Sequence, residues 1–291
     1  MRSIRTLWLL TILLLGKSIV RAKLEPRRSS DPDLIELNRH YKGYIIHDGD
    51  DDFQWRQEQQ RYFSDAGRHS QPVTHYVRQL YAQSPSICLT FMLSIAVFVA
   101  WQIPSAQPFL QRHFFCSIFN IEQRRYHTLL LASVSHKGFY HLLVNCMSLL
   151  SVGPSVRQAL APNPVWPLLL GASLSGSGMF LIMNHVTQSF SGGLGLSDVT
   201  CALIAFWARL YPERTLQFRL GPIPVTMMAK KAVYALVAWS LAATLYPVIS
   251  LGDSVGHSAH LGGLLFGYFY YDWFSQQCKR RHKWKLSFEF P

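Results

Sequence analysis

Residues 195–211 read GLSDVTCALIAFWARLY, and Asp198 and Arg209 are the charged side chains in this stretch. A nearly continuous apolar run of this length falls within the ~17–25 residues that a transmembrane helix needs. Ser197 and Asp198 stand at its beginning, where polar groups at membrane depth are costly and are therefore functional candidates. The stretch predicts a membrane-spanning helix that starts with a polar turn.

Five further apolar segments flank this one, at about 86–103, 139–156, 165–184, 231–250 and 257–274. The chain is 49% hydrophobic and 15% charged, whereas a soluble domain usually carries about 25% charged residues. Charges crowd into the two ends of the chain. We therefore expect an all-α polytopic membrane protein, with a bundle of six transmembrane helices formed by residues 86–275.

The ends of the chain have a different character. In residues 1–24, Arg2 and Arg5 precede an apolar run too short to span a bilayer, and Val20-Arg21-Ala22 resembles a signal-peptide cleavage site. No acidic residue occurs before Glu25, which favours a mitochondrial presequence, so both kinds of targeting segment stay open. Residues 25–85 predict a polar, mostly disordered extension, and residues 276–291 predict a basic tail.

The net charge of +12 fits loops held on one side of a bilayer. Zinc-finger spacing and RNA-binding aromatic motifs are absent from the sequence, so we expect the lipid bilayer, and not nucleic acid, as the partner of these charges. Most Lys and Arg residues fall on the side of both termini, which the positive-inside rule assigns to the cytosol or its equivalent. The second, fourth and sixth segments then begin at the opposite face. The loops on that face carry the remaining basic residues, namely Arg112, Arg124, Arg125 and Lys137.

Each of these three segments begins with polar residues. His141 and Asn145 share one helix face and form either an interhelical polar clamp or a donor pair for an oxyanion. Ser197 follows Gly195 and sits in the first helical turn, where its N–H is available, although a serine in an apolar helix is more often structural. His260 lies on one face with several glycines, which suits either close packing or a general base. Two small-residue stripes are predicted to pack together and to bring Ser197 and His260 within hydrogen-bonding reach: Gly193, Ser197 and Cys201 in one, and Gly256, His260, Gly263 and Gly267 in the other.

The order His-x-x-x-Asn, Gly-x-Ser and Ala-His-x-Gly-Gly on alternating helices resembles the rhomboid intramembrane proteases, over about residues 86–275. The stretches 101–105 (WQIPS) and 135–141 (SHKGFYH) are most similar to mitochondrial, presenilin-associated-type rhomboids. The resemblance implies Ser197 as nucleophile, His260 as general base, and an oxyanion hole made by His141, Asn145 and the N–H of Ser197. It also implies that Gly195 and Gly263 pack around this dyad. Asp198 departs from the family, which usually has glycine after the serine.

The resemblance implies a serine endopeptidase that needs no cofactor and cleaves single-span membrane proteins within or next to their membrane helix. A catalytically inactive relative that binds membrane helices for quality control or trafficking is the main alternative. A transporter would be expected to show internal repeats, and a metal site at His141, His257 and His260 lacks a suitably spaced carboxylate or thiolate. The expected location is the mitochondrial inner membrane, with the secretory pathway or a plastid membrane as alternatives.

Overall fold

The computed structural model describes residues 78, 80–220, 223–245 and 256–289. The predicted targeting segment 1–24 and most of the predicted extension 25–85 lie outside these residues, as do the last two residues of the predicted tail.

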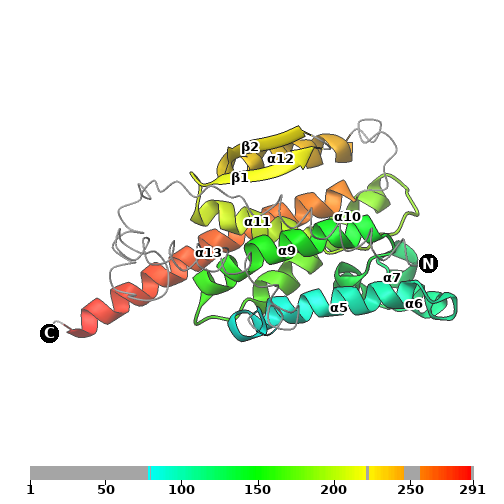
Figure 1. Cartoon of the computed structure of the whole chain (residues 1–291), viewed down its shortest axis with the longest axis horizontal. Helices are drawn as coiled ribbons and strands as arrows, with labels where there is room; N and C mark the ends of the chain where they lie inside the picture. Colours follow the sequence, from blue (N-terminus) through cyan, green and yellow to red (C-terminus); the bar gives the residue numbers. More distant parts are fainter. Residues whose placement is uncertain (1–77, 79, 221–222, 246–255, 290–291) are drawn as a thin grey trace, which may run out of the picture.

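All six predicted apolar segments are helices (Figure 1). Their bounds are α5 Pro85–Trp101, α9 Phe139–Leu160, α10 Trp166–Val186, α11 Ser197–Leu210, α12 Ala229–Leu245 and α13 His257–Glu289. By length and hydropathy alone, α9 and α10 qualify as membrane spans, and α5 joins them if it is counted with the helical segment that follows it at a bend of 106°. The helical fold class is confirmed, while the crossing of the bilayer by all six helices stays a prediction.

The long connection between α5 and α9 is built from short helices. They are η1 Pro104–Ala106, α6 Gln107–His113, α7 Ile118–Glu122, α8 Thr128–Leu131 and η2 Ala132–Val134. The buried Asn120 amide donates hydrogen bonds to the carbonyl oxygens of Gln111 and Phe115, and its oxygen accepts one from Arg125. These bonds give the connection a fixed shape, which matters because η2 lies against the beginning of α11.

A β-hairpin between α11 and α12 is a difference from the all-helical prediction. Strand β1 (Thr215–Leu220) pairs antiparallel with β2 (Ile223–Met228), with Phe218 opposite Val225. The sequence carries the signal, since polar and apolar residues alternate along 215–220 and a Gly-Pro pair follows. The segment is short and lies between two long apolar runs, so it was interpreted only as a loop between two membrane helices.

Helix α11 occupies the centre of the core, with Ala202, Leu203 and Phe206 completely buried. Helix α13 runs beside it (Figure 1). A Cβ atom added at Gly263 would lie 2.1 Å from the carbonyl oxygen of Asp198, and one added at Gly267 would lie 2.1 Å from that of Ala202. The contacts advance in the same direction along both helices, so α11 and α13 are parallel and touch at backbone distance.

This contact corrects the predicted packing by one residue. The stripe of α13 that contains Gly263 and Gly267 packs on Asp198 and Ala202, not directly on Ser197 and Cys201. Gly193 lies outside α11 altogether, where it forms a β-bridge with Cys116. Asp198 meets Gly263 through backbone atoms, so the side-chain pattern of α11 did not determine how far the helix is rotated about its axis.

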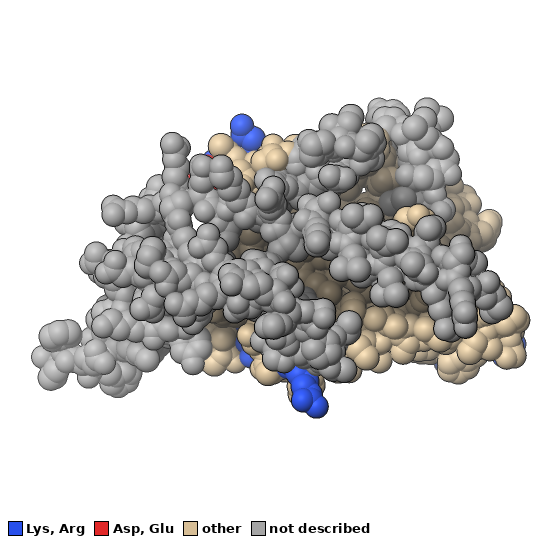
Figure 2. Space-filling model, viewed as in Figure 1, with Lys and Arg blue, Asp and Glu red and all other residues tan. Residues whose placement is uncertain are grey.

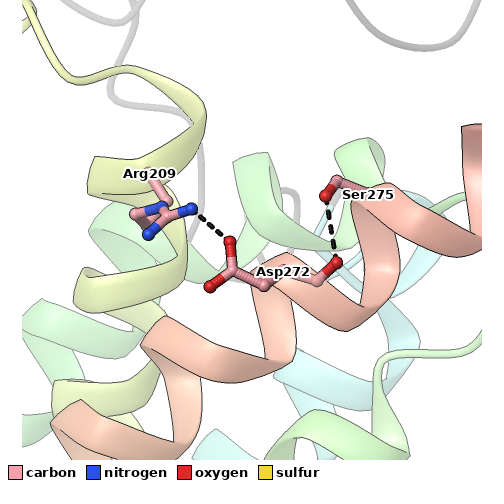
Figure 3. Close-up of polar contacts among 3 residues, drawn as sticks. All are labelled: Arg209, Asp272 and Ser275. Carbon is pink, nitrogen blue, oxygen red and sulfur yellow. Dashed lines mark hydrogen bonds and ion pairs between the residues drawn. The ribbon is translucent and has the colours of Figure 1, made fainter.

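A charged contact joins the last turn of α11 to the middle of α13. Arg209 donates to the carboxylate of Asp272, and the carbonyl oxygen of Asp272 accepts a hydrogen bond from Ser275 (Figure 3). The Arg209 guanidinium also lies over the rings of Tyr268 and Tyr271, 4.2 and 4.9 Å from their centroids. The two helices thus meet through glycines near their beginnings and through this cluster at the last turn of α11.

The outer surface of the helices is apolar. Val144 on α9, Ile182 on α10 and Phe269 on α13 are 62%, 59% and 63% exposed. In the view of Figure 2, the described surface is almost entirely free of charge, and Lys and Arg show at its margins. Such a surface is suited to contact with lipid hydrocarbon, where the helices satisfy their own backbone groups.

Candidate active site

Ser197 is the first residue of α11 and is half-buried. The backbone reaches it through Gly195, whose φ of +127° is readily adopted only by glycine. The N–H groups of the first helical turn have no carbonyl partner within the helix. The fold therefore presents the Ser197 hydroxyl and backbone N–H together at the beginning of a buried helix.

Three hydrogen bonds tie this turn to the segment 132–136. The N–H of Gly195 donates to the carbonyl oxygen of Ala132 at 2.9 Å, and the N–H of Leu196 donates to Nε2 of His136 at 3.2 Å. The hydroxyl of Ser133 donates to Oδ2 of Asp198 at 2.8 Å. Residues immediately before and after Ser197 are thus held by one short stretch of chain.

Sequence reasoning did not identify His136 as a site residue. Its side chain is fully buried, and burial, with a smaller contribution from His141, lowers its pKa to about 3. The neutral imidazole that results can accept at Nε2, as the bond from Leu196 requires. The two histidine rings meet edge to face with centroids 5.0 Å apart, so His136 touches the candidate oxyanion residue as well.

The predicted donor pair on α9 lies beside the same turn. A Cβ atom at Gly195 would lie 2.4 Å from Cε1 and 2.7 Å from Nε2 of His141, so the ring covers this glycine. One turn further along α9, Oδ1 of Asn145 accepts a hydrogen bond from the Thr200 hydroxyl at 3.4 Å. The carbonyl oxygen of Ser197 lies 3.2 Å from the same hydroxyl, so the two acceptors share its single proton. His141 and Asn145 therefore flank the first turn of α11.

His260 lies in the first turn of α13, and its N–H donates to the carbonyl oxygen of Gly256 at 3.1 Å. Its half-buried ring meets His257 edge to face, with centroids 5.8 Å apart. Gly263, three residues further on, contacts the Asp198 backbone. The first turns of α11 and α13 are thus neighbours, while a hydrogen bond from Ser197 to His260 stays a prediction.

The part of the chain that the structure describes contains no group of three or more His, Cys, Asp or Glu side chains placed to hold a metal ion. His257 and His260 lie together on α13. His141 is on α9 and lies beside Gly195, which precedes α11.

Comparisons with known proteins identify the family of this chain. The family profile described as "Rhomboid domain" matches residues 123–277. The chain is 26% identical over 201 residues to Rhomboid protein 1, mitochondrial, of Saccharomyces cerevisiae. The aligned stretch covers 67% of this chain and 55% of that protein. The chain is 28% identical over 179 residues to Presenilin-associated rhomboid-like protein A, mitochondrial, of Danio rerio, with 61% and 45% covered.

A plant relative is similar to the same degree. RHOMBOID-like protein 12, mitochondrial, of Arabidopsis thaliana is 25% identical over 183 residues, which cover 57% of this chain and 52% of that protein. The chain therefore spans about half the length of the curated relatives it matches. The matched domain covers more than half of the 291 residues and includes α9 to α12 and the beginning of α13, and this chain accordingly belongs to the rhomboid family of integral membrane proteins.

Proposed function

We propose that this protein is an intramembrane serine protease that uses Ser197 as nucleophile and His260 as general base, within a membrane domain formed by residues 86–275. The observation that carries the proposal is the backbone contact between Gly263 and Asp198. It brings the first turns of α11 and α13 together, and these turns contain the serine and the histidine. A hydroxyl is a weak nucleophile until an adjacent base accepts its proton.

In this mechanism Oγ of Ser197 attacks the carbonyl carbon of the scissile peptide bond, and its proton passes to His260. The tetrahedral oxyanion receives hydrogen bonds from the N–H of Ser197 and from the side chains of His141 and Asn145. His260 then protonates the leaving amine, which leaves an acyl-enzyme. Water attacks the acyl-enzyme with His260 again as the base, which releases the acid product and restores Ser197.

The proposed substrate class is the one that the resemblance to rhomboid proteases implies. We expect single-span membrane proteins that are cut within or next to their membrane helix. A helix shields its peptide carbonyls through its own hydrogen bonds, so the substrate must unwind locally before Ser197 can reach one. The site must also admit water.

Labelling with a serine-reactive fluorophosphonate tests the chemistry in the full chain, purified in detergent or lipid nanodiscs. We expect wild type to be labelled, and Ser197→Ala and His260→Ala to lose the label. Ser151→Ala is the matched control, because Ser151 is an exposed serine of α9 that bonds only its own helix at the carbonyl of Met147. An unlabelled wild type, or equal labelling of Ser197→Ala, would refute the assignment.

An inactive helix-binding protein is the second candidate, and Asp198 is the observation that favours it, because glycine usually follows the serine in active relatives. Co-expression with a panel of single-span reporters separates the two functions. A protease releases fragments that disappear in Ser197→Ala and His260→Ala. A helix-binding protein retains intact reporters equally well in all three chains.

We place the protein in the mitochondrial inner membrane. The three relatives described above are named as mitochondrial proteins, and residues 1–24 contain basic but no acidic side chains. A fluorescent protein fused to the C-terminal side of residues 1–30 should accumulate in mitochondria. Accumulation in the endoplasmic reticulum would instead support the secretory alternative.

A further inference from the structure

We propose that Asp198 is a positioning residue for the reaction of Ser197, acting through the hydrogen bond that it accepts from Ser133. This inference rests on the proposed protease function and extends it to a residue that departs from the family pattern. Asp198 follows the serine directly, is 4% exposed and lies at the junction of α10, α11 and α13.

The surroundings hold the Asp198 side chain in one place. A Cβ atom at Gly176 of α10 would lie 2.4 Å from the Asp198 Cβ and 3.0 Å from Oδ2, and Gly263 of α13 touches its backbone. Oδ2 accepts from the Ser133 hydroxyl at 2.8 Å, and Oδ1 accepts from the N–H of Val199 at 2.7 Å. Both carboxylate oxygens therefore have a donor.

The bonding of this carboxylate differs from that of a structural ion pair. In the described residues, the salt bridges join Arg209 to Asp272 and Lys230 to Glu213, and neither involves Asp198. Its partners are instead neutral donors at the N-terminus of α11, the Val199 N–H and the Ser133 hydroxyl. A buried acceptor is costly to leave without a donor, so loss of the Ser133 hydroxyl should disturb this turn.

The Ser133–Asp198 bond completes a set of contacts around the serine. Gly195 and Leu196 fix the chain before Ser197 through backbone N–H donors. Asp198 fixes the chain after Ser197 through its side chain, which bonds to the same segment, residues 132–136. A glycine at position 198 has no side chain with which to form this bond. The carboxylate thus gives this chain an additional hold on the turn that carries its nucleophile.

The consequence for the reaction is geometric. A displacement of about 1 Å in a reacting group can lower a rate by ~10²-fold. With the hydrogen bond removed, we expect the turn to keep its fold through the glycine contacts but to hold the Oγ atom of Ser197 in a less precise position. We expect Ser133→Ala and Asp198→Ala each to slow the reaction about tenfold. The double variant should be no slower than either single variant, because both remove the same bond.

The test measures the rate constant and the end point of fluorophosphonate labelling separately, in the full chain in nanodiscs. The end point counts folded sites, so a rate constant normalised to it is insensitive to simple loss of folded protein. Asp198→Asn keeps one oxygen as an acceptor and should retain about half of the rate. With a single-span reporter, Ser133→Ala should lower kcat and leave KM unchanged.

Ser177→Ala is the matched control, because Ser177 is a buried serine whose hydroxyl bonds the carbonyl of Leu129 at 2.9 Å. It should lower the end point or the stability without changing the rate constant. Wild-type rate constants in both Ser133→Ala and Asp198→Ala would overturn the positioning role, as would losses that multiply in the double variant. If Ser197→Ala is labelled as fast and as fully as wild type, the result would instead refute the protease function, and the role of Asp198 with it.

Discussion

Gly263 of α13 lies so close to Asp198 of α11 that an added Cβ atom would sit 2.1 Å from the Asp198 carbonyl oxygen and 3.0 Å from its Cα. Backbone atoms of a buried helix cannot move aside as the end of a flexible side chain can. The two helices must separate to admit even one methyl group.

Gly263→Ala should therefore abolish or strongly reduce fluorophosphonate labelling, since it moves the turn of His260 away from that of Ser197. Overpacking of this kind costs about 1–3 kcal/mol, so the thermal midpoint should also fall. Gly178→Ala is the control, because a Cβ atom at Gly178 of α10 meets nothing within 4 Å. Labelling of Gly263→Ala at the wild-type rate would contradict the predicted closeness of the dyad.

Gly195 carries two separate constraints, a φ of +127° and the ring of His141 in the place that a Cβ atom would need. Gly195→Ala should thus impair both the approach to Ser197 and the placement of a candidate oxyanion donor, with a loss of at least about 10²-fold in labelling rate, the size expected for one lost donor. Gly138→Ala, at a glycine with φ of −100° and open space around it, should label normally. Comparable losses in both variants would show that the glycine geometry is not what matters.

The positions of the membrane helices could be predicted from the sequence because burial in lipid demands long apolar runs. Segments two, four and six were expected to begin at about 139, 195 and 257, and the helices begin at Phe139, Ser197 and His257. The irregular connection between α5 and α9 gave no such signal, because its fold depends on single polar contacts such as those of Asn120.

The role of His136 illustrates what the local pattern omits. Its partner Leu196 is 60 residues away in the chain, and a histidine in a loop has no periodicity that predicts burial. The rotation of α11 about its axis was also undetermined, because Asp198 meets Gly263 through backbone atoms and its side chain gives no sign of that contact. Only the contacts with Gly263 and Gly267 reveal the rotation.

The buried His136 predicts a pH dependence of stability. Its folded-state pKa of about 3 lies below the ordinary value of 6.5, so the unfolded chain binds a proton more readily than the folded chain. Stability is therefore full above pH 6.5 and falls as the pH drops toward 3, by about 2 kcal/mol at pH 5.

Thermal unfolding in detergent at pH 7.5 and pH 5 measures this effect. Wild type should lose more stability over this interval than His136→Gln, whose side chain keeps an oxygen acceptor for the Leu196 N–H but does not titrate. At pH 7.5 the two chains should be closer in stability. A pH dependence that is the same in both would show that His136 does not cause it.

The contact between Arg209 and Asp272 provides the opposite kind of test, because it lies at the end of α11 farthest from Ser197. Both side chains are partly exposed, 28% and 38%, and an exposed ion pair usually contributes only about 0–1 kcal/mol. Arg209 also covers the rings of Tyr268 and Tyr271, so its loss removes packing as well as charge. We therefore expect Arg209→Ala to lower the thermal midpoint more than Asp272→Asn does. Neither variant should change the normalised labelling rate of Ser197, because the glycine contacts near Ser197 still set the spacing of the two first turns. A labelling rate that falls in both variants would mean that the contact between Arg209 and Asp272, and not Gly263, sets the register of α11 and α13.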